Sequence, residues 1–191
     1  DSSMVRDTTQ RLAGFEKEMQ DCGVFFHDLG TSQVLITKLP NRLTESTLKT
    51  CLSELKNPKN ISYDDRLAGQ IFNGNQIEFP IGLKSEHIKE LRDTLTALGN
   101  TFVHRFWIKY GLDSKMRKRE NSRSIQLHEI STNINDIWIV EQKENDFNPT
   151  HDHNTISPAG LSGVFYVRVP WEVTKPPGPA SNGLLKLVWG G

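Results

Sequence analysis

The hydrophobic period of this chain changes along its length, from helical spacing before residue 110 to strand-like runs after residue 136. The clearest helical stretch covers about residues 85–109, where Ser85 is placed to cap the N-terminus. Its apolar stripe recurs at three- and four-residue spacing and consists of Ile88, Leu91, Leu95, Leu98 and Phe102. This period predicts one long helix that buries a single face.

Two other stretches of the first half carry weaker helical patterns. Residues 4–20 show a loose apolar stripe, and residues 44–56 predict a helix for which Thr44 is a plausible cap. The apolar face of that second helix is expected to contain Leu48, Cys51, Leu52 and Leu55. Between these helices, residues 34–40 are rich in β-branched side chains and predict a strand that Pro40 ends.

The second half of the chain predicts strands. Runs rich in Val, Ile and aromatic residues are separated by clusters of Pro, Gly, Ser and Asn, and they cover residues 137–142, 161–170 and 183–189. We expect Trp138 and Trp189 to belong to the core. Helices followed by a series of strands indicate an α+β chain that ends in an antiparallel sheet or barrel.

Composition narrows the function classes. The 191 residues contain 23 Lys plus Arg and 23 Asp plus Glu, so the formal net charge is zero. This balance argues against a protein that coats nucleic acid or an anionic membrane. The polar and basic run at residues 111–124 is expected to be a solvated loop.

Length and cysteine usage suggest one domain in a reducing compartment. A chain of 191 residues can form a single domain with its own core, so we expect residues 1–191 to be one domain. Cys22 and Cys51 lack CxxC spacing, which suits the cytoplasm better than a disulfide scaffold. The sequence also lacks an apolar run of the roughly 20 residues that cross a bilayer.

The stretch "NPTHDHN", residues 148–154, places two histidines one residue apart. In an extended chain, alternate side chains point to one side, so His151 and His153 would face the same way and Asp152 the other. Two imidazoles in this arrangement can bind one Fe, Zn, Cu or Ni ion, and a third ligand would complete a facial set with open positions. The spacing alone is a weak signal and favours an exposed, unliganded pair in a turn.

The sequence around this pair resembles a known family. "WIVEQKENDFNPTHDHNTISPAGLSGVFYVRVP", followed by a loop and "GLLKLVWGG", is similar to the first half of the catalytic barrel of iron(II)- and 2-oxoglutarate-dependent oxygenases. The likeness is to a phage- and bacterium-encoded branch that carries an HxH motif. It implies a double-stranded β-helix, or jelly-roll, core over residues 136–191, with residues 1–135 as a helical and strand support packed on it and further strands after Gly191.

The resemblance implies roles for three residues. His151 matches the first iron ligand, and Tyr166 matches an aromatic residue that can hydrogen-bond the 2-oxoglutarate carboxylate. His153 stands where most of the superfamily has a carboxylate ligand. Three arrangements stay open: an all-histidine set, a carboxylate supplied by Asp152, or a site without redox chemistry. Strand alternation favours His153 as the ligand.

The implied enzyme is a hydroxylase that uses Fe(II) and 2-oxoglutarate on an unknown substrate. The third ligand and the basic residue that anchors 2-oxoglutarate are expected after Gly191, so we interpret the chain as truncated. Two alternatives are a non-catalytic jelly-roll protein, such as a virion component, and a cupin-like histidine–metal enzyme that does not use 2-oxoglutarate. His27, His87, His104 and His128 show no ligand spacing and are expected to be structural or exposed.

Overall fold

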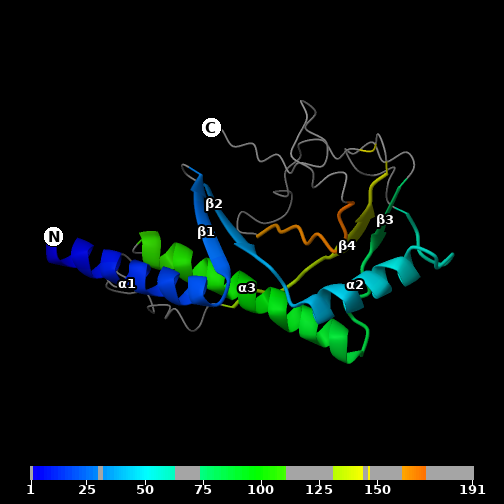
Figure 1. Ribbon diagram of the computed structural model, residues 1–191, viewed down its shortest axis with the longest axis horizontal. Helices are drawn as coiled ribbons and strands as arrows, with labels where there is room; N and C mark the ends of the chain where they lie inside the picture. The colour runs from blue at the N-terminus through cyan, green and yellow to red at the C-terminus, as the bar shows by residue number, and fades with distance from the viewer. Residues whose placement is uncertain are drawn as a thin grey trace, which may run out of the picture. The chain divides into compact units, whose positions relative to one another are not determined.

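The computed structural model describes residues 2–29, 32–62, 74–110, 131–143, 146 and 161–170. These residues form three helices and two two-stranded antiparallel sheets (Figure 1). The elements are α1 (Ser2–Asp21), β1 (Val24–Leu29), β2 (Ser32–Thr37), α2 (Asn41–Glu54), β3 (Asn75–Glu78), α3 (Glu86–Tyr110) and β4 (Trp138–Glu141). The α+β class is therefore confirmed. The described part of the chain contains no closed barrel, and the jelly-roll core stays a prediction.

The chain divides by its internal contacts into two compact units. The first contains residues 1–40 and 90–134, and the second contains residues 41–89 and 135–191. The division falls within α3, whose first turn belongs to the second unit. The expectation of a single domain stays a prediction.

In the first unit, α1 ends at a glycine turn and leads directly into a hairpin. Gly23 has a φ of 74°, a conformation that glycine adopts without the steric cost of a Cβ, and its N–H donates to the carbonyl of Gln20 at 2.9 Å. The following strands pair in the register from Val24↔Thr37 to Leu29↔Ser32. The strand predicted over residues 34–40 overlaps β2 at residues 34–37, and β1 was not predicted.

The hairpin has one covered face and one exposed face. Phe26 on the covered face lies 6.1 Å from Phe15 of α1, between ring centroids, and the guanidinium of Arg105 in α3 lies 4.7 Å from its ring. Phe25 and Ile36 are partners across the strands on the opposite face, and both are exposed. Because a two-stranded sheet is marginal by itself, the helices on its covered face account for its stability.

In the second unit, the buried face of α2 coincides with the predicted one at Cys51 but is otherwise displaced from it. Leu43, Thr47 and Cys51 are buried at four-residue spacing, whereas Leu52 is exposed. The prediction is wrong for Leu52, because the helix buries the polar Thr47 on the face that packs against the core. Its hydroxyl donates to the carbonyl of Leu43 at 2.8 Å, which removes the cost of burying an unpaired polar group. The helix begins at Asn41, so Thr44 lies within its first turn and is not the cap.

The second sheet joins segments that are far apart in the sequence. Its register runs from Asn75↔Glu141 to Glu78↔Trp138, and Ile77 and Ile139 form a buried pair at its centre. The sequence predicted β4 within residues 137–142 but did not predict β3. The expected core position of Trp138 is wrong, since 43% of this side chain is exposed on the open face of β4.

The strand predicted over residues 161–170 is also absent: these residues are described without regular secondary structure. The sequence is rich in β-formers, but a strand needs a ladder of backbone hydrogen bonds with a neighbour. Within the described part of the chain, each of the two sheets contains only its two strands. The predictions for residues 111–124 and 183–189 lie outside the described residues.

Helix α3 matches its prediction closely. It covers Glu86–Tyr110, and Ile88 and Leu91 are among its most deeply buried side chains. Ser85 precedes it and accepts the N–H of Lys89 with its carbonyl, while its buried hydroxyl makes no hydrogen bond, so it is not a side-chain cap. Among the described helices, none combines the length and the apolar character needed to cross a membrane.

Candidate functional site

The predicted metal ligands His151 and His153, together with Asp152, lie outside the described residues. The structure describes the chain on both sides of them. On the N-terminal side it describes β4, Gln142, Lys143 and Asp146, and on the C-terminal side it describes residues 161–170. The structure therefore describes the two flanks of the candidate site and not the predicted ligands themselves.

A tight turn follows β4 on the N-terminal flank. The carboxylate of Asp146 accepts a hydrogen bond from the N–H of Lys143 at 2.9 Å, through Oδ2. In return, the N–H of Asp146 donates to the carbonyl of Lys143 at 3.1 Å. These two hydrogen bonds close the turn between the end of β4 and the segment that leads to His151.

Gly74 lies against this turn. A Cβ at position 74 would stand 1.8 Å from the carbonyl oxygen of Glu141 and 2.8 Å from Oδ2 of Asp146. The first distance is far below van der Waals contact and involves backbone, which cannot move aside as the end of a flexible side chain can. Only glycine therefore fits where the chain enters β3.

Side chains also connect the two strands at this end of the sheet. Nδ2 of Asn75 donates to Oε2 of Glu141 at 3.2 Å, and Nζ of Lys143 lies 3.9 Å from the same oxygen. Both Glu141 and Lys143 are substantially exposed, so solvent screens this ion pair and it contributes little to stability. The carboxylate of Glu141 is thus engaged within the sheet.

Tyr166, the predicted 2-oxoglutarate contact, lies on the C-terminal flank and is 53% exposed. Exposure alternates along this segment: Val164, Tyr166 and Arg168 are exposed, whereas Phe165 and Val167 are half-buried. Tyr166 thus lies on the exposed side together with Val164 and Arg168, although the segment is not a strand. The phenol is accessible to a ligand.

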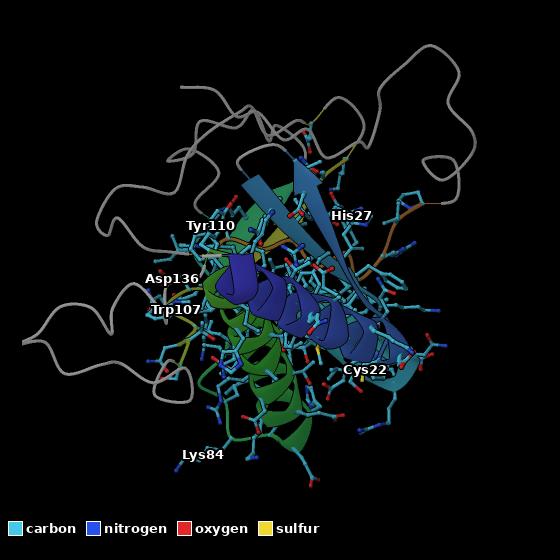
Figure 2. The ribbon with its side chains drawn as sticks, turned by 90° about the vertical axis from the view of Figure 1, so that its left-hand side faces the viewer. Cys22, His27, Lys84, Trp107, Tyr110 and Asp136 are labelled. Atoms are coloured by element: carbon cyan, nitrogen blue, oxygen red, sulfur yellow. The ribbon has the colours of Figure 1, made fainter. Side chains whose placement is uncertain are left out.

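The other described histidines do not assemble a metal site. His27 is exposed on β1 (Figure 2), and Nε2 of His87 lies 2.9 Å from Oγ1 of Thr50. His104 is half-buried on α3. No group of three or more His, Cys, Asp or Glu residues that could hold a metal is found among the described residues. The expectation that these histidines are structural or exposed agrees with the structure for the three, while His128 lies outside the described residues.

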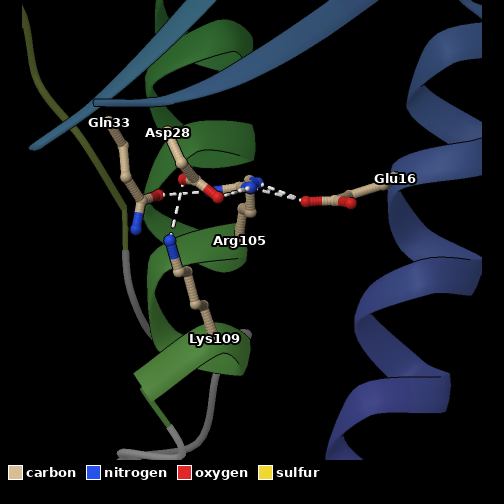
Figure 3. A network of polar contacts seen from close by, with 5 residues as sticks. All are labelled: Glu16, Asp28, Gln33, Arg105 and Lys109. Carbon is tan, nitrogen blue, oxygen red and sulfur yellow. Dashed lines mark hydrogen bonds and ion pairs between the residues drawn. The ribbon is translucent and has the colours of Figure 1, made fainter. Parts of the chain in front are cut away.

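An extensive polar cluster of the described residues lies in the first unit, around Arg105 (Figure 3). This side chain is only 3% exposed. It donates from Nε to Glu16 of α1 at 2.8 Å, from Nη1 to Asp28 of β1 at 3.1 Å, and from Nη1 to Oε1 of Gln33 in β2 at 2.5 Å. Nζ of Lys109 lies 2.8 Å from Oδ1 of Asp28. One guanidinium thus joins α1, β1, β2 and α3.

The cluster shifts the pKa values of Asp28 and Arg105 toward their charged forms. Hydrogen bonds from Arg105 and then from Lys109 lower the pKa of Asp28 below its ordinary value of 3.8. Burial by itself lowers the pKa of Arg105, but the hydrogen bonds to Asp28 and Glu16 outweigh it, so the net shift is upward. The two cations face two carboxylates, and the charges of the cluster balance.

This arrangement indicates a structural role for Arg105. Its Nε and both terminal nitrogens bind protein acceptors, which leaves the guanidinium committed to the fold. Sequence reasoning missed the cluster, although a signal was present: position 105 continues the stripe of Leu91, Leu95, Leu98 and Phe102. An arginine in register with an apolar stripe indicates a buried, paired cation.

The two cysteines differ in their surroundings. Cys22 is exposed just after α1 (Figure 2), and Cys51 is buried in α2, where burial raises the pKa of its thiol. A raised pKa leaves Cys51 as the neutral thiol at physiological pH, so it is a packing residue and a poor nucleophile.

Comparison with known proteins gives no relative for this chain. No family model, no curated protein and no solved structure matches it.

Proposed function

We propose that this chain belongs to an Fe(II)- and 2-oxoglutarate-dependent oxygenase that hydroxylates a substrate not yet known. The observation that carries the proposal is the joint occurrence of "NPTHDHN" and "LSGVFYVRVP" in one stretch after β4. A cytoplasmic location fits the two free cysteines. If a phage encodes the protein, that compartment is the cytoplasm of its host.

In this proposal, His151 and His153 bind the metal through neutral imidazoles, and Tyr166 hydrogen-bonds a carboxylate of 2-oxoglutarate. The donor types fit the group, because imidazole is a good ligand for Fe(II) and an accessible phenol can donate to a carboxylate. Once bound, Fe(II) and 2-oxoglutarate supply the oxidising chemistry that hydroxylates an unactivated C–H bond. The protein supplies binding, orientation and exclusion of water.

The fold proposed for this function is a jelly-roll core with the N-terminal helices packed on it. The exposed apolar side chains of residues 161–170 support this proposal, since Leu161, Val164, Tyr166 and Val169 would gain burial if the segment paired in a larger sheet. The proposed core also requires partner strands for this segment, a third metal ligand and a basic residue for 2-oxoglutarate.

Metal binding tests the proposal directly. The full-length protein is expected to bind one Fe(II) or Mn(II), measured by elemental analysis, and to lose it in the His151→Ala/His153→Ala double variant. His27→Ala, which removes an exposed histidine from β1, is the matched control and should leave metal content unchanged. Equal metal content in the double variant and the wild type would refute the site.

Turnover separates the proposal from its alternatives. The metal-loaded, full-length protein is expected to convert 2-oxoglutarate to succinate under oxygen, even slowly in the absence of substrate. Metal binding without succinate formation would favour a cupin-like metal enzyme. Absence of both would favour a non-catalytic structural protein.

A further inference from the structure

We propose that a small pocket between the turn after α2 and strand β3 binds a zwitterionic ligand of the size of a small α-amino acid. The described residues that line it are Lys59, Asn60 and Ile61 from the turn and Glu78 from the end of β3. All four belong to the second unit. Binding there requires none of the residues assigned to the metal, so this site goes beyond the proposed function.

Hydrogen bonds fix the turn that carries three of the lining residues. The N–H of Asn60 donates to the carbonyl of Asn57 at 3.1 Å, and the N–H of Lys59 donates to Oδ1 of Asn57 at 3.1 Å. Oγ of Ser62 donates to the carbonyl of Gln76 at 3.4 Å, which joins the end of the turn to β3. A ligand therefore does not have to order the turn, and this lowers the entropic cost of binding.

The amide of Asn60 is oriented so that it offers an acceptor. Its Nδ2 donates to the carbonyl of Glu54 at 2.9 Å and to Oε2 of the same residue at 2.8 Å. An amide nitrogen has two N–H donors and no acceptor capacity, so both donors are used. Oδ1 is the amide atom that remains to accept a hydrogen bond from a ligand.

The charged groups of the pocket require opposite charges on one ligand. Lys59 supplies an ammonium and Glu78 a carboxylate, and within the described part of the chain neither group takes part in a hydrogen bond or ion pair. A purely anionic ligand would face the like charge of Glu78, and a purely cationic one that of Lys59. A zwitterion satisfies both, with its carboxylate at Lys59 and its ammonium at Glu78 and Oδ1 of Asn60.

The size of the pocket narrows the ligand class. Its volume of about 160 Å³ equals about five water molecules at roughly 30 Å³ each. Pockets for drug-sized ligands measure about 300–1,000 Å³, so this one takes only a small molecule. Ile61, which is 68% exposed, gives it an apolar wall. An amino acid with a small apolar side chain, such as alanine, matches this combination.

Trp138 adds an aromatic group beside the carboxylate. It pairs with Glu78 across the sheet, so both side chains lie on the same face of β3–β4. The indole is 43% exposed and can face a ligand ammonium that Glu78 binds. Its N–H also provides a spectroscopic signal close to the site.

Titration of the ¹⁵N-labelled protein with L-alanine, followed by heteronuclear NMR, tests the site. We expect saturable shifts at the amides of Lys59, Asn60 and Ile61 and at the indole N–H of Trp138. The dissociation constant should be on the order of 1 mM, because the site is open to solvent and the ligand has few atoms. No saturable shift at these signals would refute the site.

Two substitutions test the two charges. Glu78→Gln and Lys59→Gln each remove one charge from an exposed side chain, so the fold should be retained. Each should weaken alanine binding about fivefold, the effect of one exposed charge pair. Lys56→Gln, which removes an exposed lysine near the same turn, is the matched control and should bind as the wild type does. Unchanged affinity in both Glu78→Gln and Lys59→Gln would overturn the proposal.

Singly charged compounds test the ligand class. Acetate carries only the carboxylate and methylammonium only the ammonium, so each should bind the wild type more weakly than alanine does. If acetate binds as tightly as alanine, the pocket is a simple anion contact at Lys59. If methylammonium does so, it is a cation contact at Glu78. Either result would overturn the assignment to a zwitterion.

Discussion

The two small sheets of this protein are held together in different ways. The β1–β2 hairpin pairs neighbouring segments, and its covered face is tied to two helices by the cluster around Arg105. The β3–β4 sheet pairs segments separated by 66 positions at Asn75 and Glu141, and it combines a buried isoleucine pair with a close backbone approach at Gly74. The β1–β2 hairpin, which is local in sequence, thus depends on side chains that are distant in sequence. The β3–β4 sheet, whose strands are distant in sequence, depends on apolar packing and on the close approach of its backbones.

This difference has a general lesson about short sheets. Neither sheet has enough strands among the described residues to be stable by backbone pairing alone. Each therefore needs a second source of stability, and the chemical nature of that source decides which perturbation the sheet is sensitive to. Charge and pH should affect the hairpin, while side-chain volume should affect β3–β4.

The largest effect is expected from truncating the isoleucine pair. Ile139→Ala should lower the free energy of unfolding by about 2–4 kcal/mol, because it leaves a cavity opposite Ile77. Urea denaturation measures the change. Val140→Ala, on the exposed side of the same strand, is the control and should cost less than about 0.5 kcal/mol. Equal losses in the two variants would show that the isoleucine pair does not stabilise this sheet.

A smaller effect is expected from removing the buried guanidinium. Arg105→Met keeps much of the side-chain volume but leaves Glu16 and Asp28 without their partner. Because both carboxylates are partly exposed, water compensates some of the loss, and we expect a cost of about 2 kcal/mol. Hydrogen exchange at β1 amides should increase before that at β4 amides.

The exposed Arg92 on the same helix offers the matched control. Arg92→Met removes a cation whose ion pair with Asp93 is 3.8 Å long and solvated, so it should be nearly neutral. If Arg105→Met lowers the free energy of unfolding no more than Arg92→Met does, the cluster does not stabilise the hairpin.

The smallest effect is the acid sensitivity of Asp28. Its pKa in the folded protein is below the ordinary 3.8, so its stabilising contribution is complete above that value and is lost as the pH falls through the folded pKa. Since 44% of this side chain is exposed, the contribution should be under about 1 kcal/mol. Comparing the unfolding free energy of wild type and Asp28→Asn between pH 6 and pH 2 (about the range in which carboxylates titrate) measures it. Identical pH profiles would contradict a stabilising role for the ionised form.

The sequence predicted the elements in which the spacing of apolar residues repeats over many positions or in which β-branched residues are concentrated. Helix α3 was found within one residue at each end because its stripe repeats from Ile88 to Phe102. Strand β3 was missed, since "NQIE" contains one β-branched residue and its pairing with β4 depends on a distant segment. Residues 161–170 show the opposite failure, because a β-rich sequence cannot indicate whether a partner strand is present.

The candidate site was predictable only in its chemistry. The spacing of His151 and His153 and the resemblance around them identify donor types, but they contain no information on what supports the ligands. The need for glycine at position 74 arises from a close approach to Glu141, and the turn before the ligand segment from a hydrogen bond to Asp146, so neither has a local signature. For Arg105, the sequence shows that the residue continues an apolar stripe, but it does not show which residues pair with it.

The partners of Arg105 also set the order in which the first unit can fold. Its contacts with Glu16, Asp28 and Gln33 span 89, 77 and 72 positions of sequence. The β1–β2 hairpin and α1 can form early from contacts between neighbouring residues. Their contacts with Arg105 can form only after the end of α3 has folded against them. During synthesis, a nascent chain that has not yet reached Arg105 would contain the carboxylates of Glu16 and Asp28 without the guanidinium that pairs with them. The hairpin and α1 would therefore reach their full stability only after residue 105 has been added.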